Sequence, residues 1–122
     1  NNNNNNNIDQ QYIYEYNNFT DYVYDVKWSN GKPGVFACCD GDGKLTIFDL
    51  TQKFKEPIYT LKVTDNNSKQ ALTTVQFGLK GKYVAVGDSN GDVTLFGCHK
   101  NLYSSNEKDF MDLEDAINRS MQ

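Results

Sequence analysis

The chain has 122 residues, a formal net charge of −4 and a pI near 4.8. Its acidic residues are scattered, and no cationic surface is expected for nucleic acid or for an anionic membrane. The longest apolar runs are far shorter than the roughly 20 residues that span a bilayer, and we expect no signal peptide because residue 1 is not followed by a charged and then an apolar segment. The three cysteines Cys38, Cys39 and Cys98 cannot all pair with one another, which favours free thiols in a reducing compartment. We therefore predict an intracellular protein with neither nucleic acid nor membrane as a partner.

A low-complexity segment opens the chain. Residues 1–7 are all Asn, and a run without apolar side chains has nothing to bury, so residues 1–11 are predicted to be disordered. Over residues 12–16 tyrosines alternate with other residues, as in a strand, before turn-forming residues follow at 17–21. We expect one strand at 12–16, at the start of a domain that extends over 12–103.

The first of two similar units is predicted to contain four strands. Their ranges are 22–28, 34–39, 44–50 and 57–63, with segments rich in Gly, Asn and Asp at 30–34 and 40–43. Pro57 has no amide hydrogen to donate, so the last of these strands is expected at the outer edge of its sheet.

The second unit repeats the first. The residues that define the repeat are Asp42, Gly43, Phe48 and Asp49 in the first unit and Asn90, Gly91, Phe96 and Gly97 in the second. Each unit begins this stretch with a dipeptide, Asp-Gly or Asn-Gly, that suits the positive φ angles of a tight hairpin turn. Strands are predicted near 71–77, 82–87 and 92–97. The fourth strand is weakly supported at 101–103, and the alternative is that another part of a longer chain supplies it.

The repeat period indicates the architecture. Trp28 precedes Phe77 by 49 residues and Asp42 precedes Asn90 by 48, which places one extra residue of the first unit near Cys38 and Cys39. Periods of about 40 to 50 residues with four short strands are typical of β-propeller blades. The predicted fold is all-β: two antiparallel four-stranded blades of an incomplete propeller, expected to have seven blades when complete, plus a short C-terminal helix. Because propellers close with about four to eight blades, we expect the chain to be part of a longer one.

The hydrophobic period changes after residue 103. Phe110, Leu113, Ile117 and Met121 recur at spacings of three or four, which predicts an amphipathic helix within residues 104–122. Ser104 and Glu107 have the spacing of a capping box. The apolar stripe is expected to dock either on the propeller or on another subunit.

No residue pattern indicates catalysis or a cofactor. His99 is the single histidine, so no arrangement of a nucleophile beside a histidine base is indicated. Cys98 and His99 have no zinc-type spacing to the other cysteines. The aspartates of the two equivalent turns are Asp40, Asp42, Asp88 and Asp92. Side chains that accept hydrogen bonds from their own backbone explain these aspartates more simply than calcium does. We predict a protein that is not an enzyme and binds no cofactor.

Two stretches carry a family resemblance. Residues 42–50 resemble the Asp-Gly-x-Val-x-Ile-Trp-Asp-Leu core of WD repeats, with Phe48 in the place of Trp. The second unit departs further, because Asn90 replaces the turn Asp and Phe96-Gly97 replaces Trp-Asp. Longer strings, at 21–29, 36–38, 40–41 and 81–89, resemble the last two blades of the intermediate chains of cytoplasmic dynein. The likeness covers roughly residues 12–96.

This resemblance implies a non-catalytic scaffold of the dynein motor, located in the cytoplasm and associated with microtubules. In that family the propeller holds the intermediate chain on the tail of the dynein heavy chain, and an N-terminal region without a counterpart here binds light chains and dynactin. The residues predicted to contact a partner are Lys32, Phe54, Lys55 and Tyr83 in or beside loops, and Phe110, Leu113 and Ile117 in the helix. The alternatives are an axonemal dynein intermediate chain and a WD-repeat adaptor of another complex.

Overall fold

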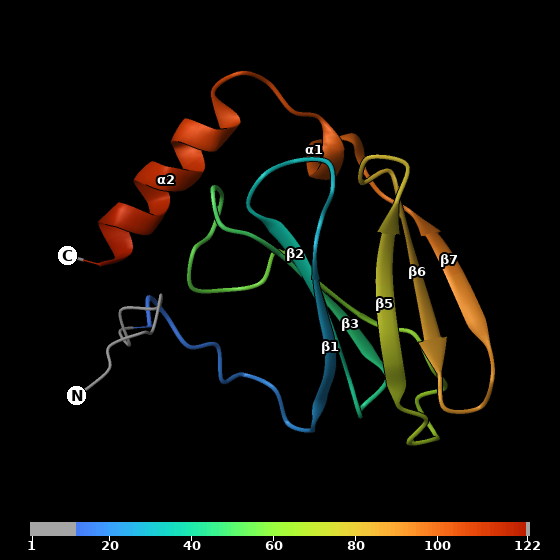
Figure 1. Ribbon diagram of the computed structural model, residues 1–122. Coiled ribbons are helices and arrows are strands. Elements are labelled where there is room, and N and C mark those ends of the chain that lie inside the picture. The colour runs from blue at the N-terminus through green and yellow to red at the C-terminus, as the bar shows by residue number, and fades with distance from the viewer. Residues whose placement is uncertain (1–11, 122) are drawn as a thin grey trace, which may run out of the picture.

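A computed structural model describes residues 12–121, which form seven strands and two helices (Figure 1). The Asn-rich segment predicted over 1–11 lies outside the described residues. The strands are β1 Val23–Trp28, β2 Val35–Asp40, β3 Lys44–Asp49, β4 Tyr59–Lys62, β5 Leu72–Gly78, β6 Tyr83–Asp88 and β7 Val93–Gly97. The helices are α1 Lys100–Tyr103 and α2 Asp109–Ser120. All seven strands lie within a few residues of their predicted ranges.

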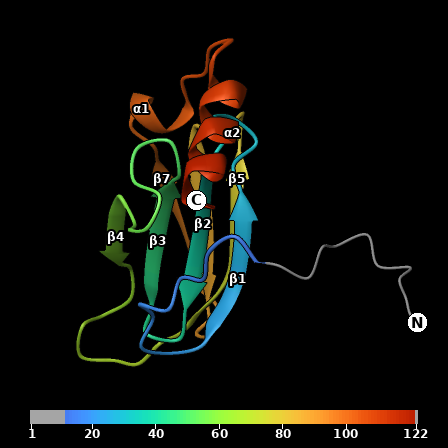
Figure 2. The same ribbon diagram turned by 90° about the vertical axis from the view of Figure 1, so that its left-hand side faces the viewer.

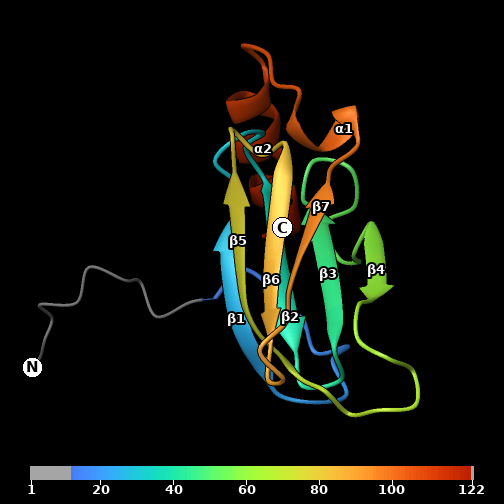
Figure 3. The same ribbon diagram turned by 90° about the vertical axis from the view of Figure 1, so that its right-hand side faces the viewer.

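The strands form two antiparallel sheets that face each other. The first has the order β1-β2-β3-β4 and the second the order β5-β6-β7. Figure 3 shows β5–β7 in front of the first sheet, and Figure 2 shows α2 in front of β2 on the opposite side. The described part of the chain is therefore layered as helix, four-stranded sheet and three-stranded sheet.

Alternation along the strands builds the apolar core between the sheets. Successive side chains of a strand point to opposite faces, so every second residue reaches the neighbouring sheet. The first sheet contributes Val35, Ala37, Cys39, Leu45 and Ile47, and the second contributes Leu72, Val75, Phe77, Val84 and Val86. Cys38 lies in a separate cluster on the other face, so the two adjacent thiols are buried on opposite sides of β2, as the sequence predicted.

The strand register shows which residues of the two sheets occupy equivalent positions. Ala37 pairs with Ile47 in the first sheet, and Ala85 pairs with Leu95 in the second. Residues of β2 and β3 thus precede their equivalents in β6 and β7 by 48 positions. In the same way β1 precedes β5 by 49, because Lys27 pairs with Ala37 and Gln76 pairs with Ala85.

This register corrects the predicted position of the extra residue. It lies in the loop between β1 and β2, at 29–34, and not near Cys38 and Cys39, because the hairpins that follow have equal lengths in both sheets. The loop is held by the Ser29 amide, which donates to the Val35 carbonyl at 2.8 Å. The two sheets also share an irregularity in register at equivalent places, after Val23 and after Leu72.

The predicted four-stranded second blade is wrong for the described residues, where its sheet has three strands. Residues 101–103 belong to the short helix α1 and not to a strand. The His99 ring accepts a hydrogen bond from the Asn101 amide at 3.1 Å through Nδ1, which starts a helical turn where an edge strand would have to begin. β7 therefore has no partner on its outer side within residues 12–121.

The predicted strand at 12–16 is also wrong, because this segment lies against the face of the first sheet and pairs with no edge. The Tyr16 ring packs on Phe36 and Phe48, with centroids 5.9 and 4.7 Å away, and its hydroxyl donates to the Phe54 carbonyl. Tyr16 thus packs on a sheet face, Tyr14 packs on Tyr16 and Phe54, and Tyr12 is 76% exposed.

The predicted capping box at Ser104 and Glu107 is displaced by two residues. The Asn106 side chain accepts from the Lys108 amide at 2.8 Å, and the Asp109 carboxylate accepts from the Asn106 amide at 2.6 Å. This reciprocal pair of hydrogen bonds satisfies the free amides at the helix start, as a capping box does.

None of the helices within residues 12–121 has the length and apolar composition needed to cross a membrane.

Candidate interaction surfaces

The second sheet exposes an apolar face on its far side. We call this the open face; it consists of Thr74, Gln76, Tyr83, Ala85, Gly87, Val93 and Leu95. Val93 and Leu95 are 75% and 68% exposed. A β-branched residue and a leucine side by side on a sheet usually mark a face that packs against another element, since sheets bury their apolar face.

The open face corresponds to a buried face of the first sheet. By register, Val93 and Leu95 occupy the positions of Leu45 and Ile47, which are each 3% exposed because the second sheet covers them. Ala85 has the same position as the fully buried Ala37. The open face therefore has the pattern of a sheet-packing surface. Of its residues the sequence predicted only Tyr83; the others were detectable from strand alternation combined with the repeat.

The opposite side of the first sheet is covered only in part. We call it the outer face; it consists of Val26, Trp28, Phe36, Cys38 and Phe48. Tyr16, Phe19, Phe54 and Leu113 pack on its central residues. Val26 and Trp28, on the edge strand β1, remain 56% and 62% exposed.

A carboxylate joins the two sheets. Asp25 on β1 accepts from the Val75 amide of β5 at 3.0 Å, and from Lys27 at 2.9 Å. The hydrogen bond from Lys27 is the main cause that lowers the pKa of Asp25 below its usual value. The equivalent position in the second sheet is Thr74, which has no charge. An ionised Asp25 thus links β1 and β5, the first strands of the two sheets.

Two of the four turn aspartates, Asp40 and Asp88, bind their own backbone as predicted, whereas Asp42 accepts from the Thr20 hydroxyl instead. Asp40 accepts from the amides of residues 42 and 44 at 2.9 and 3.1 Å, and Asp88 accepts from those of residues 90 and 92 at 2.9 Å each. Gly43 and Gly91 have φ angles of 78° and 91°, the left-handed conformation that glycine adopts readily. Within residues 12–121, no three His, Cys, Asp or Glu side chains are grouped so that they could hold a metal ion.

The two repeat motifs differ at their ends. Phe48 stacks on Phe36, with ring centroids 4.6 Å apart, and the adjacent Asp49 is fully buried. Asp49 forms an ion pair with Lys32 at 2.8 Å and accepts from the Thr51 hydroxyl at 2.7 Å. Burial alone would raise the pKa of Asp49, but the hydrogen bonds from Lys32 and Thr51 outweigh it and hold this pKa below its usual value.

The second unit has no such ion pair, because Gly97 occupies the position of Asp49. Phe96 is half-buried at the edge of the core between the sheets. Asn90 is exposed, and Asp42 is half-buried and accepts from the Thr20 hydroxyl. The motif therefore stabilises the first sheet more than the second.

The predicted contact residues fall into two groups. Lys32, Phe54, Leu113 and Ile117 are partly or largely buried, with Lys32 held by Asp49 and with Phe54 and Leu113 packed on the outer face. Lys55, Tyr83 and Phe110 are exposed. The Lys55 ammonium lies 5.8 Å from the centroid of the Tyr14 ring. The predicted stripe of α2 is thus divided, because Leu113 faces the sheet while Phe110 is 74% exposed.

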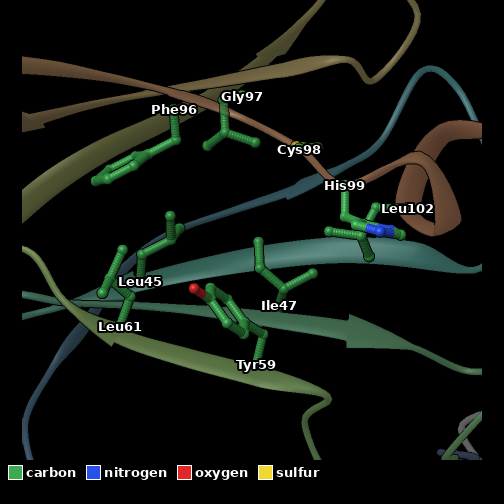
Figure 4. A pocket seen from close by; sticks show the side chains of 10 residues that line it. Leu45, Ile47, Tyr59, Leu61, Phe96, Gly97, Cys98, His99 and Leu102 are labelled. Carbon is green, nitrogen blue, oxygen red and sulfur yellow. The ribbon is translucent and has the colours of Figure 1, made fainter.

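A cavity of about 280 Å³ opens between the outer strands of the two sheets (Figure 4). Its lining includes Leu45, Ile47, Tyr59, Leu61, Phe96, Cys98, His99 and Leu102. The cavity lies where a strand beyond β7 would face β4. Burial raises the pKa of Cys98, which keeps its thiol protonated at neutral pH. The apolar lining and the neutral Cys98 thiol are suited to pack against apolar side chains.

Comparison with known proteins identifies dynein intermediate chains among the relatives of this chain. No protein family model matches the chain. The chain is 32% identical to the cytoplasmic dynein 1 intermediate chain of Drosophila melanogaster over 94 aligned residues, which make up 77% of this chain. It is 36% identical over 100 residues, or 79% of this chain, to the flagellar outer arm dynein 78 kDa intermediate chain of Chlamydomonas reinhardtii. The matched region makes up 14% of the length of each relative. By this homology, the chain belongs to the dynein intermediate chain family.

Proposed function

We propose that the chain supplies two adjacent blades of a β-propeller in a dynein intermediate chain, and that this propeller is a non-catalytic scaffold that binds the dynein heavy chain. In this proposal the protein serves microtubule-based transport in the cytoplasm. The homology to two dynein intermediate chains is the observation that carries the assignment to dynein. The whole-protein role is an extension from relatives of which the chain matches 14%.

The open face supports the propeller part of this proposal. A sheet that repeats the first one at an offset of 48 to 49 residues, and whose exposed side matches a packed side of that first sheet, is suited to accept a further blade. A rigid ring of blades presents loops to a partner without a large ordering cost, which suits a scaffold. Lys55, Tyr83 and Phe110 are the predicted contact residues whose side chains are exposed, and we propose Lys55 and Phe110 as partner contacts.

A flagellar role is the second candidate. The identity to the flagellar outer arm relative is 36%, against 32% for the cytoplasmic one, so an axonemal dynein is a specific alternative to cytoplasmic transport. The two candidates share the scaffold chemistry and differ in the heavy chain that is bound.

The test is affinity capture of the tagged protein from its own cells, followed by mass spectrometry of the captured proteins. The proposal predicts recovery of a dynein heavy chain together with light chains. A cytoplasmic heavy chain supports transport, whereas an axonemal heavy chain supports the flagellar candidate. Recovery of a different complex without any dynein heavy chain would reject both.

A further inference from the structure

The outer face of the first sheet corresponds, residue by residue, to the face of the second sheet that packs in the core. Trp28 pairs with Phe36 as Phe77 pairs with Val84, and Phe36 pairs with Phe48 as Val84 pairs with Phe96. In the second sheet these positions pack against another sheet. The outer face therefore has the residue pattern of a face that packs against another sheet.

The outer face is covered by a helix and by aromatic side chains, and not by a sheet. Leu113 of α2 and the aromatic rings of Tyr16 and Phe19 pack there. This cover leaves Trp28 62% exposed, whereas its equivalent Phe77, under a sheet, is 3% exposed. Helix α2 and the segment that contains Tyr16 and Phe19 thus occupy part of the outer face, whose residue pattern is that of a face packed against a sheet.

Helix α2 is held on the outer face by side-chain packing. Of the residues of α2, only Asp109 and Ala116 are buried, and Phe110 and Met111 are largely exposed. Asp109 is used within its own cap, through the Asn106 amide. The connection at 104–108 is exposed along its whole length, and the helix can leave without breaking any hydrogen bond between strands.

We propose that α2 is a displaceable cover, which a neighbouring propeller blade replaces on the outer face of the first sheet. This inference rests on the proposed propeller and goes beyond it, because a blade seated on Phe36 and Phe48 takes the place of Leu113 of α2, together with the rings of Tyr16 and Phe19 that pack beside it. The occupant is a sheet with a face like the open face of β5–β7, since that pattern already packs on Phe77 and Val84 through its equivalents Leu45 and Ile47. Displacement releases Leu113, Ala116 and Ile117, which join Phe110 and Met111 on a helix free to bind elsewhere.

The experiment compares the chain with a tandem protein in which a second copy of residues 12–103 precedes it. The preceding copy offers its own open face as the incoming blade and carries Trp28→Phe, so that the single remaining Trp28 reports on the outer face. Lys55→Cys and Arg119→Cys place thiols on the two sides of the groove between α2 and the loop after β3. Cys98→Ser, introduced in both copies, removes the half-buried thiol. Cys38 and Cys39 stay buried, with pKa values raised by burial to about 11 and about 12.

In the chain alone, a short bismaleimide should link positions 55 and 119, and Trp28 should be quenched readily by iodide. In the tandem protein, Trp28 emission should shift to the blue, iodide quenching should fall several-fold, and the 55–119 link should drop to the yield of a Lys55→Cys, Glu114→Cys control pair. Glu114 is exposed on the same helix and does not line the groove. A buried Trp28 with an undiminished 55–119 link would overturn displacement. A folded tandem protein with an accessible Trp28 would show that the outer face does not accept a blade.

A second measurement uses the chain alone and needs no tandem protein to fold. If α2 is a displaceable cover, its amides should exchange with deuterium at least tenfold faster than those of β2 and β3, because the helix opens while the sheet stays intact. Equal protection of α2 and the sheet would contradict the proposal. Neither measurement involves a heavy chain, so a negative capture experiment would reject the proposed function and leave these results unaffected.

Discussion

The two sheets of this chain are copies of one pattern that differ in what covers them. Ile47 in the first sheet and Leu95 in the second stand at equivalent positions, yet one is buried and the other is 68% exposed. Conversely, Phe77 is buried in the second sheet and its equivalent Trp28 is exposed in the first. The burial of a residue is thus decided by the neighbouring layer, while its side of the sheet is decided by the strand period.

The sheets also differ in their polar contacts. The first sheet has Asp25 reaching across to β5, the Asp49–Lys32 pair, and the edge strand β4, and the equivalent positions of the second sheet hold Thr74, Gly97 and the helix α1. The second unit lacks these contacts but keeps the apolar alternation and the turn in which Asp88 accepts from two backbone amides. The apolar pattern and this turn suffice to form three paired strands here, whereas Asp25 and the Asp49–Lys32 pair fix the first sheet relative to the other sheet and to its own loops.

The largest expected difference is between Phe77 and Trp28. Phe77→Ala should lower the free energy of unfolding by about 3–5 kcal/mol, because it leaves a cavity between the sheets. Trp28→Ala should cost only about 0.5–1.5 kcal/mol, mainly the loss of its edge contact with Phe36, whose ring centroid lies 5.1 Å away. Urea unfolding followed by circular dichroism measures both. Equal losses would mean that the two sheets are covered alike.

The second comparison concerns Ile47 and Leu95, on the other side of each sheet. Ile47→Ala removes a buried side chain and should cost about 2–5 kcal/mol. Leu95→Ala alters a mostly exposed position and should change stability by no more than about 0.5 kcal/mol. The same urea titrations decide this. A large loss for Leu95→Ala in the isolated chain would show that the open face is already covered in solution, for example by a second copy.

The third comparison concerns Asp49, whose equivalent in the second sheet is Gly97. Asp49→Asn should cost about 1–3 kcal/mol at pH 7, because Lys32 then lies largely buried without its charge partner. The pKa of Asp49 is lowered in the folded protein. Its stabilisation is therefore complete above the unfolded pKa of about 3.9 and is lost as the pH falls through the lower, folded pKa.

Urea midpoints of the native chain and the Asp49→Asn variant should thus differ at pH 7, and the difference should shrink progressively at pH values below about 3.9. Lys53→Gln, an exposed lysine of the following loop, serves as the charge control and should behave like the native chain at both pH values. A difference between native chain and Asp49→Asn that grows as the pH falls would contradict the assigned direction.

The smallest effects are expected in the two equivalent turns. Asp40→Ala and Asp88→Ala each remove an acceptor for two backbone amides, and each should cost about 0.5–1.5 kcal/mol. Asp40 should lie at the upper end, because it is buried whereas Asp88 is half-exposed and water can replace it. Thermal unfolding of both variants measures the pair. A turn aspartate without effect would mean that the glycines Gly43 and Gly91 alone determine these turns.

The strands and turns were predictable because they depend on local patterns. The alternation of apolar residues located all seven strands, and the Asp-Gly and Asn-Gly dipeptides located the hairpins with glycines at positive φ. The buried Cys38 and Cys39 followed from their place in a strand. The helix α2 followed from its apolar spacing, although its cap at Asn106 and Asp109 replaced the one expected at Ser104.

The rest depended on contacts between distant segments. Alternating tyrosines at 12–16 have the strand period, but whether they join a sheet edge or cover a face depends on the aromatic cluster of Phe36 and Phe48, which the local sequence does not contain. Lys32 was expected to contact a partner, and its ion pair with Asp49 crosses 17 residues of chain. The open face needed the strand register, since only the equivalence with Leu45 and Ile47 distinguishes a packing face from an ordinary exposed strand.

The most direct test of the central claim is heavy-chain capture with one pair of variants. Leu95→Lys places a charge on the open face, and Leu79→Lys places it at a similarly exposed position, 70% against 68%, in the loop between β5 and β6. If the open face packs on another blade of a dynein intermediate chain, Leu95→Lys should lower heavy-chain recovery at least tenfold and Leu79→Lys should leave it nearly unchanged. Equal recovery with both variants would contradict the claim that this face completes a propeller.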